Sequence, residues 1–347
     1  MKIELPDIIT TVRRARLELE YEGQDISRDI EGMVLSFSFT DHAHGQADDL
    51  ELVLENRAGL WGGDWRPAEG DRVNAVIVCT NWDEPLDRIE VPCGEFSVDG
   101  ICLTGPPDTV VIRGVSSFTD SAIRQETKTK AWENTNLGAI AQEIAGTHGL
   151  ELYWDAENVD LKRVDQRDES DLAFLKRLCE ENGYNIKVSG SLLIIYEGDT
   201  YEGGDAAVTL IRGENRILNY EINSAAHGTY RACEVSYQDP KTKKVQSYTF
   251  TPENAPEQGP ILKINEKVDS QAEAEKRAKA ALREKNKGQV TGSFELTGTP
   301  ALAGGTVIEI EGFHSFDGNY LVEEARHTLD RGAGYKTSVS FRNLLEY

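Results

Sequence analysis

The sequence predicts a mainly β protein of the α+β class, with two similar antiparallel β-barrels separated by a small α+β module. Three observations support this. Apolar and polar residues alternate in short segments near both ends of the chain, helical spacing dominates the centre, and three short motifs recur in the same order in the two ends. We expect domains at 1–118, 119–203 and 204–347, because 347 residues exceed the ~250–300 at which single cores stop growing.

The first region contains a series of short segments with the period-two alternation of half-buried strands. Loops rich in glycine and proline separate them. Six or so strands at this spacing, with no helix among them, predict a closed or nearly closed barrel. The expected strands are 15–21, 35–39, 50–54, 73–79, 94–99 and 109–115.

The central region starts after a polar stretch, 116–134, which we interpret as a domain boundary. A helix is expected from a Thr135 cap to about His148, followed by a strand at 150–154. A second helix, within 168–184, begins at a Ser170 cap and ends at Gly183, which can adopt the left-handed conformation. A hairpin of two strands, 184–188 and 192–196, should then provide a surface on which this helix packs.

The third region returns to strand patterns and has one helical exception. Alanine and leucine recur among charged residues from 270 to about 287, which predicts a long helix that stops at Gly288. The expected strands are 217–222, 230–237, 245–250, 290–296, 307–311, 320–324 and 335–341.

The two β regions share three motifs in one order, which favours a duplicated barrel. Gly94-Glu95-Phe96-Ser97-Val98-Asp99 matches Gly318-Asn319-Tyr320-Leu321-Val322-Glu323 as glycine, any residue, aromatic, any residue, valine, acid. The other two pairs are 43–45 (AHG) with 226–228 (AHG), and 70–73 (GDRV) with 305–307 (GTV). The pattern is structural, because glycine permits a bend and residues two apart share a strand face.

Composition excludes several classes of function. The chain has 60 acidic and 37 basic residues and a net charge of −23, which argues against specific binding to a nucleic-acid backbone. No stretch approaches the ~20 apolar residues of a membrane helix, and no secretion signal follows Met1, so we expect synthesis in the cytoplasm and no membrane binding. The five cysteines form no Cys-x-x-Cys pair, which favours buried free thiols over disulfides or zinc sites.

Three groups of residues are candidate sites, each with a plainer structural interpretation. His42 and His44 with Asp41 have metal-ligand chemistry, but a polar loop explains them equally simply. Trp61 and Trp65 could grip a sugar or a partner protein, or could cover the end of the barrel. The acidic candidates for paired carboxylates in glycoside hydrolysis are Asp155, Glu157, Glu180 and Glu181. Acids are abundant throughout, so we assign no catalytic, metal or cofactor residue and expect no cofactor.

Four segments resemble the phage late control protein D family, the baseplate hub proteins of contractile tails. The main segment is 170–178 (SDLAFLKRL) followed by Asn182-Gly183-Tyr184; the others are 48–52 (DDLEL), 94–96 (GEF) and 318–322 (GNYLV) followed by His327. The family is also similar to the N-terminal part of type VI secretion spike proteins. The resemblance implies two tail-tube-like barrels and a structural, non-enzymatic hub.

In that family, three subunits form a ring that joins a sixfold tail tube to a threefold central spike. The expected partners are therefore two further copies of the chain, the tail tube protein, the spike protein and other baseplate proteins, within the baseplate of a virion or phage-tail-like particle. The alternative is a tail-associated protein that binds or degrades peptidoglycan. The sequence does not identify the residues that contact these partners.

Overall fold

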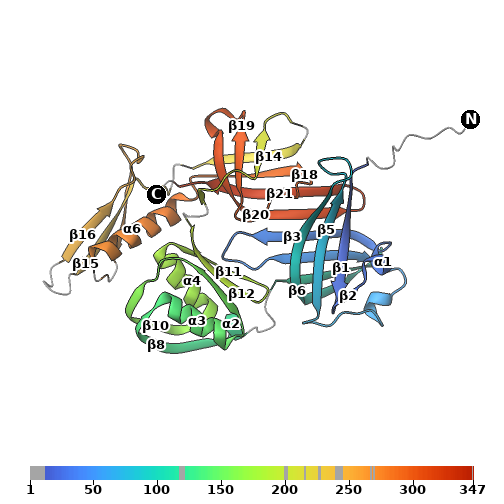
Figure 1. Cartoon of the computed structure of the whole chain (residues 1–347), viewed down its shortest axis with the longest axis horizontal. Coiled ribbons are helices and arrows are strands. Elements are labelled where there is room, and N and C mark those ends of the chain that lie inside the picture. Colours follow the sequence, from blue (N-terminus) through green and yellow to red (C-terminus); the bar gives the residue numbers. More distant parts are fainter. Residues whose placement is uncertain are drawn as a thin grey trace, which may run out of the picture.

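The computed structural model describes residues 12–116, 122–198, 202–214, 216–225, 228–238, 245–265, 268, 270–345 and 347. Strands predominate and helices are few, so the mainly β class is confirmed. Figure 1 shows four parts, which we name the first arm (blue), the middle module (green), the second arm (yellow to red) and the inserted unit of three strands and one helix (orange). Each part has its own cluster of buried apolar side chains.

The first arm contains the strands that alternation predicted. Its elements are β1 (Arg14–Tyr21), β2 (Gln24–Asp25), α1 (Ser27–Ile30), β3 (Val34–His42), β4 (Asp49–Glu55), η2 (Leu60–Gly62), β5 (Arg72–Thr80), β6 (Arg88–Thr104) and β7 (Thr109–Val115). Neighbouring strands pair in the order β1-β5-β6-β7-β4-β3. The apolar positions of each strand point inward, and Phe37, Leu54 and Phe96 are almost fully buried in the core.

The middle module confirms the helix and hairpin expected at its centre. Its elements are α2 (Ala122–Gln125), β8 (Thr127–Asn136), α3 (Leu137–Thr147), β9 (Glu151–Asp155), β10 (Asp160–Ser170), α4 (Asp171–Asn182), β11 (Tyr184–Ser189) and β12 (Leu192–Glu197). The Ser170 side chain accepts a hydrogen bond from Ala173 N, and Gly183 ends α4 with a φ of 76°. The cap of α3 is Asn136, one residue later than expected.

The expected boundary at 116–134 is wrong over its second half, because residues from Thr127 onward form β8, which pairs with β10. The error has a physical reason. Only Trp132 of β8 is fully buried, and its ring stacks on Phe174 at 6.1 Å between centroids. A strand that buries so little has no apolar alternation to detect.

The second arm has its own strands around an aromatic core. Its elements are β13 (Val208–Ile211), β14 (Ile217–Ser224), β18 (Val290–Thr297), β19 (Val307–Glu311), η3 (His314–Phe316), β20 (Gly318–Asp330) and β21 (Gly334–Asn343). Phe294 lies at the centre, stacked on Phe341 and edge-on to Phe313. The recurring motif at 226–228 falls partly outside the described residues.

The inserted unit corrects the expectation that strands at 230–237 and 245–250 belong to the second barrel. They form a separate three-stranded sheet, β15 (Ala232–Gln238), β16 (Val245–Phe250) and β17 (Ile261–Asn265), against α6 (Gln271–Asn286). The predicted long helix is confirmed, with Ser270 as its cap. Its alanines, Ala274 and Ala278, are fully buried against Cys233 and Val235. Small side chains let this helix lie close to the sheet.

One sheet of 13 strands runs through both arms. β20 is long enough to pair with β19 through its first residues and with β3 from Glu324 to Asp330. Its neighbour β21 pairs along nearly its whole length. The order of strands in this sheet is open at both ends, so two separately closed barrels are not confirmed.

The two arms nevertheless have the same strand order. The two-residue β2 and the inserted unit have no counterpart and are left aside. The remaining strands then match position by position, since the first arm has the order β1-β5-β6-β7-β4-β3 and the second has β13-β19-β20-β21-β18-β14. The motif glycines follow this correspondence, since Gly94 lies in β6 and Gly318 begins β20. One pairing differs, because β1 and β5 are antiparallel whereas β13 and β19 are parallel.

The cysteines are free thiols. Four cysteines are buried free thiols, as expected for most of them, whereas Cys102 is exposed on β6. Burial raises the pKa of Cys79, Cys93 and Cys179 to about 12, so these thiols are unreactive at neutral pH. Within the described ranges, no helix has the length and apolar character needed to cross a membrane.

Replacing Gly304 by alanine should weaken the contact between the arms. A Cβ atom at position 304 would lie 2.5 Å from the backbone nitrogen of Ala43. Because the atoms in the way belong to the backbone, only a shift of the end of β3 would relieve this clash. We expect the free energy of unfolding in urea to fall by about 1–3 kcal/mol. Gly288→Ala is the matched control, because a Cβ there meets nothing within 4 Å. Equal stability of the two variants would contradict this close packing.

Candidate functional site

Two of the four acidic residues considered for hydrolysis, Glu157 and Glu181, form ion pairs with α6. Glu181 contacts Arg177 at 3.2 Å and Arg277 at 3.0 Å, which links α4 to α6. Glu157 contacts Lys276 at 3.3 Å, with its own side chain largely exposed. A general acid needs an environment that raises its pKa, such as burial away from cations. Glu157 and Glu181 instead lie beside cationic side chains.

The segment 41–44 is not the loop that the sequence suggested over its whole length, because Asp41 and His42 end β3, and its two histidines lie in different environments. His42 lies 3.7 Å from both Asp49 and Glu324, and the Asp49 carboxylate, with a smaller contribution from Glu324, raises its pKa. Burial, with Lys287 and other nearby cations, lowers the pKa of His44 to about 4. Among the residues that the structure describes, no three histidine, cysteine or acidic side chains are grouped to hold a metal ion.

Asp41 instead helps to form a buried junction between three parts of the molecule. The Lys187 ammonium, from β11 of the middle module, donates to the Asp41 carboxylate at 2.7 Å and to the His42 carbonyl at 2.6 Å. It also lies 3.0 Å from Asp48. The second oxygen of Asp41 accepts a hydrogen bond from Gly304 N in the second arm. One carboxylate therefore binds both the module and the second arm to β3.

The pKa of Lys187 reflects this setting. Burial alone would lower it, but the carboxylates of Asp41 and Asp48 outweigh burial and hold it above the ordinary lysine value. Lys187 therefore stays charged at neutral pH. A buried cation with two carboxylate partners fixes position because moving any partner leaves an unpaired charge.

Glu202 forms a second junction, which joins the exit of the middle module to the second arm and α6. Its carboxylate lies 2.8 Å from Arg342 of β21 and 2.8 Å from Arg283 of α6. It also accepts a hydrogen bond from Leu345 N at 3.2 Å. Burial would raise the pKa of Glu202, but the two arginines outweigh it and lower the pKa below the usual value. Sequence reasoning missed Lys187 and Glu202, since neither belongs to a recognisable local motif.

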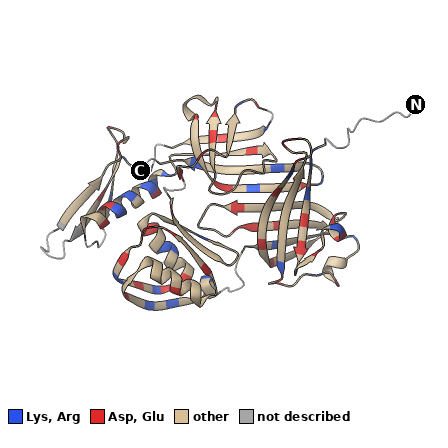
Figure 2. Cartoon of the chain, in the orientation of Figure 1, with Lys and Arg blue, Asp and Glu red and all other residues tan. Residues whose placement is uncertain are grey.

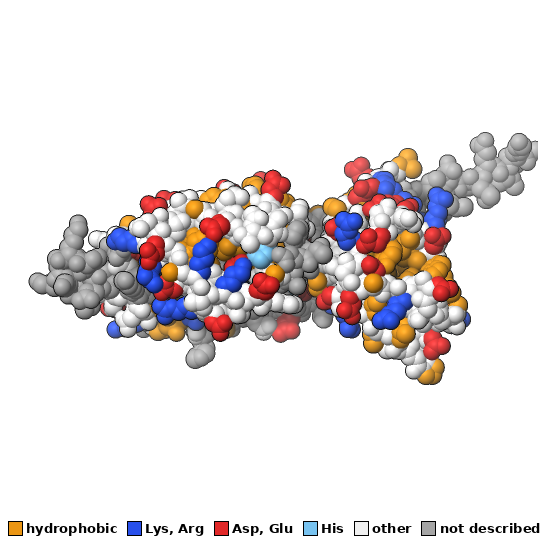
Figure 3. Space-filling view, turned by 90° about the horizontal axis from the view of Figure 1, so that it is seen from below, with side chains coloured by type: hydrophobic (Ala, Val, Ile, Leu, Met, Phe, Trp, Pro, Cys, Tyr) orange, Lys and Arg blue, Asp and Glu red, His pale blue; other side chains and the backbone are white. Residues whose placement is uncertain are grey.

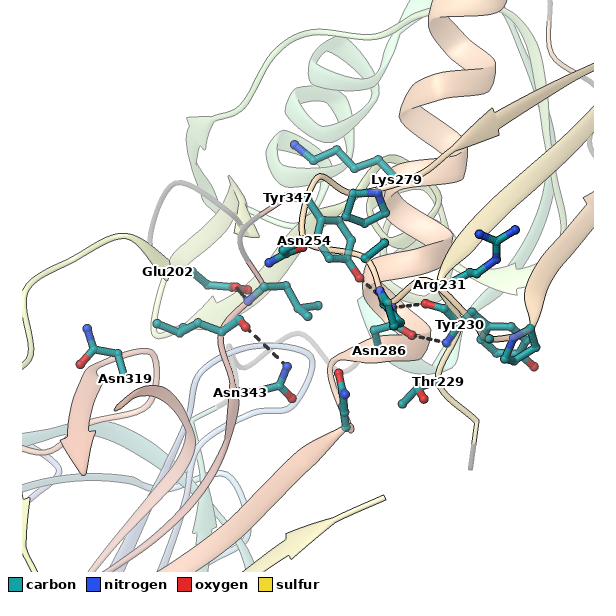
Figure 4. A pocket seen from close by; sticks show the side chains of 18 of the residues that line it. Glu202, Thr229, Tyr230, Arg231, Asn254, Lys279, Asn286, Asn319, Asn343 and Tyr347 are labelled. Carbon is teal, nitrogen blue, oxygen red and sulfur yellow. Dashed lines mark hydrogen bonds between the residues drawn. The ribbon is translucent and has the colours of Figure 1, made fainter. Parts of the chain in front are cut away.

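A polar cleft of about 1360 Å³ lies beside this junction (Figure 4). The inserted unit contributes Tyr230 and Asn286 to its wall, and the second arm contributes Asn319 and Asn343. The Asn286 amide donates to the Tyr230 carbonyl and accepts from Tyr230 N, both at 2.8 Å. These hydrogen bonds fix the start of β15 on α6, so the amide has a structural role.

The exposed edges of the large sheet are the best candidates for contact with other chains. β14 lies at one end of the strand order, and β1 lies near the other, where only its last two residues pair with β2. Leu218 and Tyr220 on β14 are 47% and 42% exposed, and Glu221 is its one charged residue. A long edge with so few charges is a ready template for pairing.

Charge is distributed unevenly over the parts. Figure 2 shows acidic residues scattered over the strands of both arms, whereas α6 carries a row of lysines and arginines. Several of those basic residues are already paired with Glu157, Glu181 and Glu202. Lys276, Arg277 and Arg283 therefore serve contacts within the chain.

The Trp61 and Trp65 side chains lie edge to face at the end of the first arm, with ring centroids 5.6 Å apart. Trp61 is buried in the core of the arm, and Trp65 is 41% exposed. Trp61 thus covers the end of the arm, whereas Trp65 is accessible to a partner.

Comparison with known proteins gives concordant results. The family model described as "Phage tail baseplate hub (GPD)" matches residues 108–333. The probable baseplate hub protein of Escherichia phage P2 is 29% identical over 233 residues, which cover 64% of this chain and 57% of the phage protein. The matched part thus spans little more than half of that relative.

Two solved structures of other proteins have a fold similar to that of this chain. A tail protein from Neisseria meningitidis MC58 has a TM-score of 0.71 at 13% identity, covering 95% of this chain and 97% of its own. The E. coli c3393 protein, described as a component of the type VI secretion system, has a TM-score of 0.57 at 12% identity, covering 95% and 77% respectively.

Replacing Glu202 by glutamine should destabilise the fold, because it removes the carboxylate that Arg283 and the buried Arg342 share and leaves Glu323, at 3.2 Å, as the remaining ion-pair partner of Arg342. We expect a loss of about 3–5 kcal/mol in the free energy of unfolding in urea at pH 7. Glu214→Gln, at an exposed position, is the control.

The stabilisation that Glu202 provides depends on pH, and it decreases in acid. Because the folded pKa of Glu202 is lowered, its contribution is present above the ordinary value of 4.5 and is lost as the pH falls through the folded pKa. The difference between wild type and Glu202→Gln should therefore shrink on acidification below 4.5. A difference below about 1 kcal/mol at pH 7, the range of exposed ion pairs, would contradict the role of this junction.

A family model that matches 108–333, together with the phage P2 relative, identifies the family: the chain belongs to the phage tail baseplate hub (GPD) family.

Proposed function

We propose that this chain is the structural hub of the baseplate of a contractile phage tail or a related injection particle. Three copies form a ring that joins the sixfold tail tube to the threefold central spike. Each copy contributes two tail-tube-like barrel domains, at 1–118 and 204–347, on either side of the α+β module at 119–203, and the second barrel is interrupted by the inserted unit. The chain is made in the cytoplasm and assembles into the particle with tube, spike and other baseplate proteins.

The observation that carries this proposal is the shared strand order of the two arms. A duplicated unit lets three chains present six similar surfaces, which is what a contact between threefold and sixfold objects requires. The family supports the same role, since the phage P2 relative is named a probable baseplate hub protein.

The free edges supply a means of closing the ring. A ring needs heterologous contacts, in which one surface meets a different surface of the next copy. The β14 edge and the β1 edge lie at opposite ends of one sheet, so pairing between copies would continue the sheet around the ring. Three copies would carry a charge of −69, three times −23, and part of it would line a channel that DNA or acidic cargo does not adhere to.

The proposed role involves no enzymatic step, no cofactor and no binding to membranes or to specific nucleic-acid sequences. Of the candidate acids, Glu157 pairs with Lys276, and Glu181 pairs with Arg177 and Arg277. We assign the exposed Trp65 to contact with a partner protein rather than to sugar binding.

Analytical ultracentrifugation over a salt series, with and without the spike protein, tests the trimer. Because like charges oppose closure, we expect weak association at low salt and a trimer at raised salt or with the spike. Leu218→Lys on the β14 edge should weaken the trimer, whereas Tyr153→Lys, on the similarly exposed β9, should not. A stable dimer or a homohexamer under all conditions would rule out the proposed geometry.

Zymography on peptidoglycan tests the absence of hydrolytic activity. We expect no cleared band from pure protein, because the candidate acids are held by cations. Lysozyme on the same gel is the positive control. A cleared band that disappears in Glu157→Gln or Glu181→Gln would establish the alternative function instead.

A further inference from the structure

The end of the first arm near α1 and η2 contains an apolar cavity of about 180 Å³. The inner faces of β1, β4, β5, β6 and β7 form its floor, and the loop that carries Trp61, Trp65 and Pro67 forms its rim. The mouth of a β-barrel is a common place for binding sites. Its lining is apolar except for the Tyr21 hydroxyl and the carboxylate of Asp29.

The Trp61 side chain lines this cavity and carries an unused hydrogen-bond donor. Trp61 is 6% exposed, and its Nε1 is buried with no acceptor among the residues that the structure describes. Buried polar groups in native proteins nearly always have a partner. A ligand carbonyl would supply the missing acceptor when the Trp61 ring shifts on binding, since the nitrogen has almost no accessible surface in the unbound chain.

The rim is held in place before anything binds. Trp61 N donates to the Asn56 side chain, and Trp65 N donates to the Leu60 carbonyl, each at 3.1 Å. The far end of the loop is fixed by Asp71, which accepts hydrogen bonds from Ala68 N and the Tyr21 hydroxyl. A rim that is already ordered loses little conformational entropy on binding.

The apolar surface extends beyond the cavity. Trp65 is 41% exposed, and the 54% exposed Leu103 lies beside η2, where its methyl group approaches Gly62. Figure 3 shows hydrophobic side chains gathered on the first arm in the view from below. A ligand that covers this surface as well as the cavity must be larger than a small molecule, which indicates part of another protein.

The charge beside the cavity indicates the chemistry of that protein. Asp29 is exposed at the cavity, and its carboxylate has no hydrogen-bond or ion-pair partner in the described part of the chain. Its neighbour Asp25, by contrast, is bonded to Ser27. An available carboxylate next to an apolar site favours a lysine or arginine on the arriving segment.

We propose that this cavity is a socket for one phenyl- or leucine-sized side chain of a partner protein, with a basic residue next to it in the partner sequence. Its volume suits this side chain, because a comparable apolar cavity of about 150 Å³ admits benzene. The partner's backbone carbonyl accepts from Trp61 Nε1, and its basic residue pairs with Asp29. This socket is independent of the proposed hub role.

Fluorine NMR titration of the purified chain with two tripeptides tests the proposal. Both carry acetyl and amide ends and a central 4-fluorophenylalanine, flanked by two lysines in one and by two glutamates in the other. We expect the lysine peptide to bind about threefold to fivefold more tightly, as for an exposed ion pair. Asp29→Asn should abolish this preference, and Asp99→Asn, an exposed acid on the outer face of β6, should leave it intact.

Three variants test the cavity and the donor, and a fourth serves as the control. Val98→Phe fills the cavity and should reduce binding of both peptides at least about tenfold, as expected when a side chain cannot enter. Trp65→Ala, at an exposed position, serves the same purpose if Val98→Phe does not fold. Trp61→Phe removes the donor and should weaken both peptides about fivefold, the effect of one hydrogen bond. Leu86→Ala, an 81% exposed apolar residue in the 81–87 loop, is the matched control.

Three results would overturn the proposal. The first is no binding of either peptide at millimolar concentration. The second is unchanged binding in both Val98→Phe and Trp65→Ala. The third is binding of 4-fluorotoluene as tight as that of the lysine peptide, which would identify a free apolar molecule as the ligand.

Discussion

Seven residue pairs between β20 and β3, from Glu324 with His42 to Asp330 with Ser36, hold together segments that lie more than 280 positions apart in the chain. Their pairing merges the two arms into one sheet, so neither arm can turn independently. The buried His327 strengthens this region, since its ring nitrogens bond the Tyr335 hydroxyl at 2.7 Å and the Leu302 carbonyl at 2.9 Å. The Lys187 and Glu202 junctions then attach the middle module and α6 to this shared sheet. This rigid connection suits the hub role that we propose.

Local patterns in the sequence predicted much of the fold. The cap at Ser170 and the left-handed Gly183 gave the limits of α4 correctly, and alternation located the strands of the first arm. β8 was missed because only Trp132 of it is fully buried. The separate sheet of the inserted unit was missed because a strand pattern says nothing about which sheet the strand joins.

The candidate site was less predictable, for a physical reason. Lys187 and Glu202 gain their roles only when distant segments bring Asp41 and Arg342 against them, and an isolated lysine or glutamate carries no sign of this. Conversely, the acids and histidines that stood out in the sequence have ordinary structural surroundings. The sequence likewise cannot show that Trp61 Nε1 lacks an acceptor, because this follows only from how the described residues pack.

Cryo-electron microscopy of the intact particle, with this chain carrying a small tag, tests the central claim most directly. The hub assignment predicts tag density at three equivalent positions where the tube meets the spike, with the shared β3–β20 sheet of each copy continuous across its two arms. Tag density only at the periphery of the baseplate, six tags around the tube, or no tag in the particle would contradict it.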